Sequence, residues 1–144
     1  MHAIWNLFFT VFFVWLLTMS FFWLSDQGLL IADIPAFHLV LLSIATFRLV
    51  RLFTYDHIME PIRSWLSGFQ ERTFLGTGAA LLKCPWCTGM WFAFLAYVGY
   101  AAIPNVVLPI ALILSIAGVA SLFQLLANLI GWSAEEKKQR VERM

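Results

Sequence analysis

Residues 84–103 read CPWCTGMWFAFLAYVGYAAI, and this stretch decides the fold of the chain. It opens with a Cys-Pro-Trp-Cys motif, contains no charged residue, and has the length of the roughly 20-residue helix that crosses a bilayer. It directly follows residues 55–83, the only long polar segment before the charged C-terminal tail. We therefore predict a transmembrane helix whose N-terminal turn carries two thiols.

The composition of the whole chain supports a membrane location. The chain has 144 residues, of which 62% are hydrophobic and 12% are charged, whereas an average soluble domain carries about 25% charged residues. The net charge of +1 provides no strong field that would attract nucleic acid or an acidic substrate. The length suits one compact unit. We therefore expect an integral membrane protein that forms a single membrane domain over residues 1–144.

Three other apolar runs have the length of a membrane span. The first, residues 4–24, contains no charged residue, follows no basic region and precedes no small-residue cleavage site. These features favour a retained helix over a cleaved signal peptide. The sequence thus predicts an all-α fold, a polytopic transmembrane helix bundle with four spans at about 4–24, 34–53, 84–103 and 107–130.

The basic residues predict how these spans are oriented. In a four-span bundle all of them fall on one side, and they are Arg48, Arg51, Arg63, Arg72, Lys83, Lys137, Lys138, Arg140 and Arg143. Loops rich in Lys and Arg stay in the cytoplasm. Both termini, segment 55–83 and tail 133–144 should therefore be cytoplasmic, in a multi-pass protein of the cell membrane. In the alternative of three spans, with the first segment removed or lying flat, the segment and the tail still share one side.

A cluster of basic and acidic side chains follows the second span. It consists of Arg48, Arg51, Asp56, Glu60 and Arg63. Pro61 argues against one continuous helix here, because proline disfavours helical geometry at the residue before it. Pro61 instead suits the first position of a new helix, with Glu60 near the N-terminus, where a carboxylate is favourable. The apolar residues that follow share one face and predict a short cytoplasmic amphipathic helix at the membrane interface: Ile62, Trp65, Leu66 and Phe69.

The cluster has two interpretations. In the first, Arg48 and Arg51 extend to lipid headgroups and the carboxylates pair with them. In the second, the residues form a buried ion-pair network that faces the bundle and contacts a ligand, a lipid headgroup or a partner. A charge inside a span costs about 2.5–3.5 kcal/mol on insertion scales. Because Arg48 lies more than one turn inside the end of the span, we hypothesise that it pairs with Asp56 or Glu60.

The dithiol is the candidate site for chemistry. Pro85 suits the first position of its helix, which makes Cys84 the cap and places Cys87 in the first turn. The positive end of the helix dipole and the cationic side chain of Lys83 then both favour the thiolate form of the cysteines.

Three interpretations of the dithiol stay open. The cysteines pack or anchor an interface in the reduced state, they bind metal, or they carry out redox catalysis. A permanent disulfide is not expected on the reducing cytoplasmic side. Zinc is compatible with the Cys-x-x-Cys spacing, but the chain has only two cysteines, so histidine, carboxylate or a second subunit must supply the other ligands. Gly89, which permits close approach of another backbone, and Trp91 are the supporting residues.

The order of these motifs resembles an uncharacterised family of small bacterial and phage integral membrane proteins, a domain of unknown function whose members include a sporulation protein. The motifs are ATFRLVRL at 45–52, YDHI at 55–58, EPIR at 60–63 and CPWCTGMW at 84–91. The resemblance covers about residues 39–125, and the first span is less typical of the family. It implies a membrane location but no reaction, and it singles out Arg48, Arg51, Asp56, Glu60, Arg63, Cys84, Cys87, Gly89 and Trp91.

Three functions are compatible with these features. The leading one is a non-enzymatic protein that binds or scaffolds a partner through its cytoplasmic face, in sporulation or a phage cycle. The second is a thiol-redox or metal-binding membrane protein that uses Cys84 and Cys87, with zinc as a compatible metal. The third is a holin-like pore former, which the interrupted arginine cluster disfavours. The expected partners are membrane lipids, a second copy of the chain or another membrane protein, and not nucleic acid.

Overall fold

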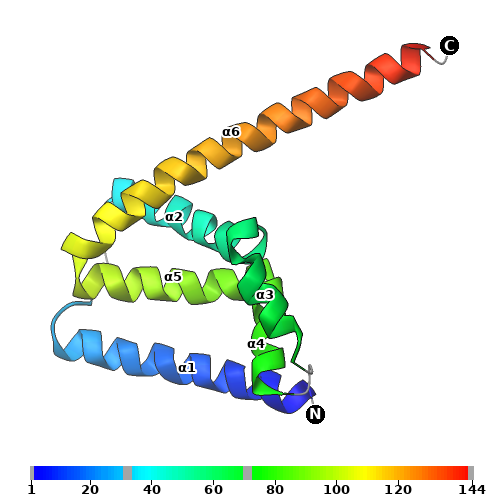
Figure 1. Cartoon of the computed structure of the whole chain (residues 1–144). Helices are drawn as coiled ribbons and strands as arrows, with labels where there is room; N and C mark the ends of the chain where they lie inside the picture. The colour runs from blue at the N-terminus through cyan, green and yellow to red at the C-terminus, as the bar shows by residue number, and fades with distance from the viewer. Residues whose placement is uncertain (1, 31–33, 70–72, 143–144) are drawn as a thin grey trace.

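The computed structural model describes residues 2–30, 34–69 and 73–142, and within these ranges every regular element is a helix (Figure 1). The expected all-α class is therefore confirmed. Arg72 and Arg143, two of the basic residues that predict the orientation, lie outside the described residues. The elements are α1 (His2–Asp26), α2 (Ala36–Thr54), the 3₁₀ turn η1 (His57–Met59), α3 (Glu60–Ser67), α4 (Phe74–Lys83), α5 (Pro85–Ala102) and α6 (Pro104–Glu142).

Three helices, α1, α2 and α6, are each long and apolar enough to cross a membrane. α4 and α5 satisfy the same criterion only as a pair, and the chain bends by 93° between them. α5 alone has 18 residues and is about 27 Å long at 1.5 Å per residue, close to the hydrocarbon thickness of about 30 Å. The chain is thus a multi-pass membrane protein with three to four candidate spans.

α4 is an element that sequence reasoning missed, because it lies within segment 55–83, which was interpreted as polar. Its sequence, FLGTGAALLK, contains two glycines, which usually signal a loop. Thr73 nevertheless starts the helix by accepting a 3.1 Å hydrogen bond from the backbone N–H of Gly76. Thr77 and Ala79 of α4 are buried. The helix therefore joins the bundle and crosses the end of α5 almost at a right angle.

The core of the bundle lies where α2, α5 and α6 meet. Its buried residues are Leu41, Leu42 and Ala45 of α2, Tyr100 of α5 and Ala111 of α6. Lipid tails are as apolar as these side chains, so close packing and hydrogen bonds between helices must stabilise the bundle. Both are present in this region.

The closest approach is between α2 and α6. A Cβ atom at Gly118 would lie 2.7 Å from Cγ2 of Ile44 and 3.2 Å from its carbonyl oxygen, so only glycine fits at this position without a shift. A few residues earlier in α6, the buried hydroxyl of Ser115 donates a 2.6 Å hydrogen bond to the carbonyl oxygen of Leu41. α2 and α5 are also joined by a polar contact, 2.7 Å between Nδ1 of His38 and the hydroxyl of Tyr100.

α1 lies on the other side of α5 from α2 (Figure 1). Its contacts with α4 and α5 are mainly aromatic. Ring centroids are 5.1 Å apart for Phe9 and Phe74, and 4.8 Å apart for Phe13 and Trp91. Most other side chains of α1 are exposed. Of the three long apolar helices α1, α2 and α6, α1 therefore has the smallest share of buried residues in its membrane-spanning part.

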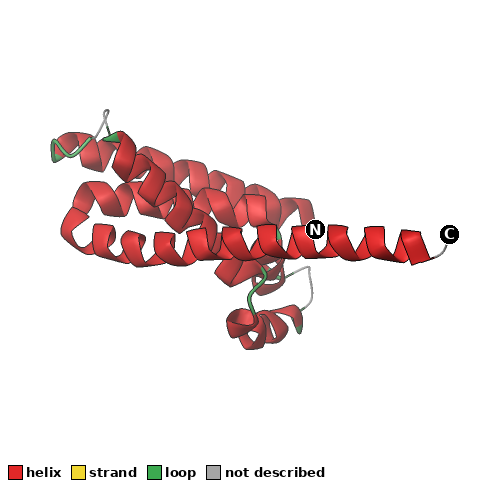
Figure 2. Ribbon diagram, turned by 90° about the horizontal axis from the view of Figure 1, so that it is seen from above, coloured by secondary structure: helices red, strands yellow, loops and turns green. Residues whose placement is uncertain are grey.

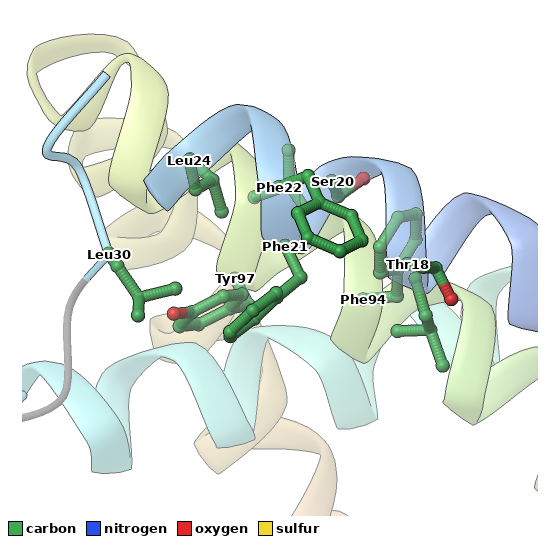
Figure 3. A pocket seen from close by; sticks show the side chains of 10 residues that line it. Thr18, Ser20, Phe21, Phe22, Leu24, Leu30, Phe94 and Tyr97 are labelled. Atoms are coloured by element: carbon green, nitrogen blue, oxygen red, sulfur yellow. The ribbon is translucent and has the colours of Figure 1, made fainter. Parts of the chain in front are cut away.

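A cavity of about 480 Å³ lies between α1 and α5, near the loop that follows α1 (Figure 3). Phe21 and Leu24 of α1, Leu30 of the loop, and Phe94 and Tyr97 of α5 contribute to its walls. The described residues that line it are mainly apolar, with hydroxyl groups from Thr18, Ser20 and Tyr97, and include no carboxylate, imidazole, guanidinium or thiol group. The cavity is therefore better suited to hold an apolar group, such as a lipid chain, than to catalyse a reaction.

α6 is longer than the predicted last span. The helix begins at Pro104, directly after Ile103, and continues without a break to Glu142, so described residues of the charged tail extend the span as one helix. All residues from 122 to 141 are exposed, and Figures 1 and 2 show this half of α6 projecting beyond the other helices. Gln124 and Asn128, in this projecting half, hydrogen-bond to each other at 3.1 Å.

Candidate functional site

One end of the bundle gathers most of the polar residues singled out from the sequence. Three whole elements lie toward this end: η1, α3 and α4 (Figure 1). The C-terminal end of α2, the N-terminal end of α5 and the charged end of α6 also lie there, as do both termini. The opposite end carries the C-terminal end of α1, the N-terminal end of α2 and the turn at Ile103. We call the set Arg48, Arg51, Asp56, Glu60 and Arg63 the arginine cluster.

Arg48 pairs with Asp56. Its Nη1 lies 2.6 Å from Oδ2 of Asp56, and the two side chains are 21% and 25% exposed. The pairing arises because α2 ends at Thr54 and the chain turns back, so that the carboxylate of Asp56 faces the last turns of the helix. The hypothesis that Arg48 pairs with Asp56 or Glu60 is thus confirmed for Asp56. Glu60 pairs with His57 instead.

Arg51 sits one turn further along α2, and it has no ion-pair partner among the described residues. Its guanidinium carbon lies 5.8 Å from the ring centroid of Tyr55, a cation–π contact. Its Nε atom is buried and has no hydrogen-bond partner among the described residues. The hydroxyl oxygen of Thr54, on the same last turn, is also buried and unpartnered there.

Arg63 returns to the end of α2 from α3. Its Nη1 donates a 3.0 Å hydrogen bond to the carbonyl oxygen of Phe53. The last carbonyl groups of a helix lack partners within the helix and carry its negative dipole end, so a guanidinium is favourable there. Pro61 is the second residue of α3, one position later than the sequence predicted, and it lies within the first turn, where its missing N–H costs no helical hydrogen bond. Three arginines thus converge on the last turns of one helix.

Glu60 belongs to the exposed edge of the cluster. Its Oε2 lies 2.6 Å from Nδ1 of His57, and both side chains are mainly exposed. The hydrogen bond from His57, its charge and then the charge of Arg63 hold the pKa of Glu60 below its usual value. Sequence reasoning assigned no role to His57, and the single turn of η1 is what brings it to Glu60.

The dithiol occupies the bend between α4 and α5. Cys84 is the cap of α5, Pro85 is the first helical residue, and the Sγ atom of Cys84 accepts a hydrogen bond from the N–H of Cys87 at 3.4 Å. This local geometry is the one the motif predicts. Both cysteines are free and half-buried. Lys83 is exposed at the last turn of α4, and Trp86, between the thiols, is 85% exposed.

The described residues contain no group of three or more His, Cys, Asp and Glu side chains that could hold a metal ion. Zinc bound by both thiols would therefore need ligands from outside the described part of this chain. Trp91 packs against α1, as described above. A Cβ at Gly89 would make an ordinary 3.7 Å contact with Val50, so this glycine lies against α2 but does not require the absence of a side chain.

The arginine cluster and the dithiol lie at neighbouring helix ends. The contact of Gly89 with Val50, and the rings of Phe53 and Phe92 with centroids 5.0 Å apart, join the last turns of α2 to the first turns of α5. No described contact links an arginine side chain directly to a thiol. A second cavity, of about 430 Å³, opens beside Cys87 and is lined in part by polar groups of Asn6, Thr10 and Thr77. This cavity could not be predicted from the sequence, because its walls come from three helices.

The chain resembles a family of known proteins and two curated relatives. A family model described as "Protein of unknown function (DUF1360)" matches residues 67–127, from the end of α3 into α6. The chain is 38% identical over 106 residues to the "Sporulation protein YjcA" of Bacillus subtilis (strain 168), which covers 62% of this chain and 90% of that relative. It is 29% identical over 96 residues to the "UPF0713 protein YngL" of the same organism, covering 59% of this chain and 74% of the relative. No solved structure matches the chain significantly.

Proposed function

The chain belongs to the DUF1360 family of proteins of unknown function, and on this premise we propose that it is a non-enzymatic membrane protein that binds a partner through its arginine cluster. Its family membership confirms the resemblance noted from the motifs. The observation that carries the proposal is the convergence of three arginines on the end of α2, of which only Arg48 has a carboxylate partner among the described residues. Arg51 and Arg63 form no ion pair among the described residues, and their charges can attract a negatively charged group.

We place this end of the bundle in the cytoplasm. The described basic residues of α2, α3, α4 and the α6 tail lie toward this end, and loops rich in Lys and Arg stay on the cytoplasmic side. The end of α1, the start of α2 and the turn at Ile103 lie toward the other end, and the sequence has no Lys or Arg between residues 25 and 35 or at residues 103–105. The similarity to a protein named for sporulation supports a role in that process.

A photo-crosslinking experiment in living cells tests the proposal. A photoreactive amino acid replaces Ile58, which is 71% exposed beside the cluster, and the matched control replaces Ile113, which is 68% exposed in the first third of α6. We expect an adduct of defined mass at position 58 whose yield falls when Arg51 and Arg63 are both changed to Gln. An adduct whose yield ignores these arginines, or appears equally at position 113, would contradict partner binding at the cluster.

The second candidate function is thiol-redox or metal chemistry at Cys84 and Cys87. It is favoured by the position of the Cys84 sulfur at the N-terminus of α5 and by the cavity beside Cys87. Redox chemistry would convert the two thiols to a disulfide, with two electrons and two protons passing to an acceptor of the disulfide or quinone class. Thiol titration and metal analysis of the purified protein separate the two chemistries. Retention of full function by the Cys84→Ser/Cys87→Ser variant would exclude both.

A further inference from the structure

The charges of the arginine cluster are not balanced within the cluster. Arg48 is neutralised by Asp56, and Glu60 is directed to His57 at the exposed edge. Arg63 donates to a backbone carbonyl, and Arg51 contacts an aromatic ring. Neither Arg51 nor Arg63 therefore forms a close ion pair among the described residues, although the charge of Arg63 is felt by Glu60. A guanidinium inside the hydrocarbon region of a membrane needs a polar or anionic partner.

Arg51 and Thr54 also leave buried polar atoms without partners. An unsatisfied buried donor costs about 1–3 kcal/mol, and here Nε of Arg51 and the hydroxyl of Thr54 occupy the same last turn of α2. Phosphate oxygens accept several hydrogen bonds at once, and the planar guanidinium group matches their geometry in pairs. A phosphate group is therefore a chemically suitable partner for both of these atoms.

The surroundings of the two arginines indicate where the phosphate comes from. The side chains of Tyr55, Ile58, Ile62 and Trp65 are all exposed around the cluster, although they are large and apolar. Aromatic and apolar side chains next to arginine, at the end of a membrane span, are typical of the interface between headgroups and acyl chains. A water-soluble anion would leave this apolar surface in water, whereas a lipid covers it.

We propose that Arg51 and Arg63, with the hydroxyl of Thr54, bind the phosphate of an anionic phospholipid whose acyl chains cover the exposed apolar residues of η1 and α3. The inference rests on the proposed function and names the partner of the arginine cluster as a lipid. Arg48 has a different role, since Asp56 already neutralises it and the pair fixes the turn that brings α3 back to α2.

The experiment titrates the purified full-length protein, in detergent, with phosphatidylglycerol and with phosphatidylcholine, and counts bound lipids by native mass spectrometry. One basic residue near a membrane surface contributes about 1 kcal/mol toward an anionic lipid, or about fivefold in affinity. We expect phosphatidylglycerol to bind at least fivefold more tightly than phosphatidylcholine. Arg51→Gln and Arg63→Gln should each remove about fivefold of this preference. The control Arg140→Gln, which alters an exposed pair with Glu136 on the projecting tail, should keep it.

Three results would overturn the inference. They are equal binding of the two lipids by the unmodified protein, an unchanged preference in both Arg51→Gln and Arg63→Gln, and displacement of phosphatidylglycerol by an equal concentration of inorganic phosphate. The third result would identify a site for a soluble anion. If the lipid preference is absent while a protein adduct at position 58 still depends on Arg51 and Arg63, the proposed function stands with a protein partner. If that adduct is absent as well, both fail.

Discussion

α1 and α2 are both apolar helices of membrane-spanning length, yet they are held in the bundle by different means. α2 packs against α5 and α6 through a glycine contact, a serine hydrogen bond and a histidine–tyrosine contact, and it ends in an ion pair. α1 rests on α4 and α5 through aromatic rings, with cavities beside it. Hydrophobicity inserts both helices into the membrane, but it does not favour contact with another helix over contact with lipid, because lipid tails are equally apolar. Specific small and polar contacts therefore decide which helix belongs to the core.

The largest effect is expected at the contact of α6 with α2. Gly118→Leu forces a side chain into the space occupied by Ile44, and overpacking of this kind costs about 3 kcal/mol. The matched control is Gly131→Leu on the same helix, where no atom lies within 4 Å of the added Cβ. Thermal unfolding in detergent should show a large loss for Gly118→Leu and almost none for Gly131→Leu. Equal losses would mean that the close approach of α2 and α6 does not stabilise the bundle.

The ion pair at the end of α2 should give the next largest effect. Arg48→Ala leaves the partly buried carboxylate of Asp56 without its partner, which we expect to cost about 1–2 kcal/mol in the free energy of unfolding. The exposed pair of Arg140 and Glu136 provides the control, because Arg140→Ala should cost about 0.3–0.5 kcal/mol. An Arg48→Ala protein as stable as the Arg140→Ala protein would show that the pair is not structural.

A smaller and local effect is expected in α1. Phe9→Ala removes the stacked contact with Phe74 and should weaken the association of α1 by about 1 kcal/mol. Hydrogen–deuterium exchange should therefore increase in α1 peptides and stay unchanged in α2. Leu7→Ala, at an exposed position of the same helix, is the control. A parallel increase of exchange in α1 and α2 would show that the two helices unfold as one unit. That result would contradict the view that they are held in the bundle by different contacts.

Sequence reasoning predicted the features that depend on neighbouring residues. Pro61 lies in the first turn of a helix and Cys84 caps one, because proline and a capping side chain act on the turn in which they lie. It did not predict the contact of Gly118 with Ile44 or that of His38 with Tyr100, because these depend on how distant helices pack. α4 was missed because its two glycines imitate a loop, although burial compensates for their low helix propensity.

For the candidate site too, the sequence predicted which residues take part but not how they pair. Spacing alone left Asp56 and Glu60 as equal partners for Arg48. The choice follows from the turn after Thr54, which directs Asp56 back to α2 and leaves Glu60 to His57. The unpartnered state of Arg51 and Thr54 was not visible in the sequence, since it depends on which side chains fail to reach them.

The smallest effect is expected at the exposed edge of the cluster. The pKa of Glu60 is lowered in the folded protein, so its ionised form favours folding above the unfolded-state pKa. This contribution is lost as the pH falls through the lowered pKa. The melting temperature of Glu60→Gln should therefore lie slightly below that of the unmodified protein at neutral pH and approach it in acid. A difference that grows in acid would have the wrong sign.

Cysteine labelling tests most directly the central claim, that the arginine cluster and the dithiol face the cytoplasm at one end of the bundle. A membrane-impermeant maleimide is applied to intact cells and to inverted membrane vesicles, and Gln27→Cys in a Cys84→Ser/Cys87→Ser background reports on the opposite end. We predict that Cys84 and Cys87 react only in inverted vesicles and that the cysteine at position 27 reacts only in intact cells. Labelling of Cys84 or Cys87 from outside the cell would contradict the account.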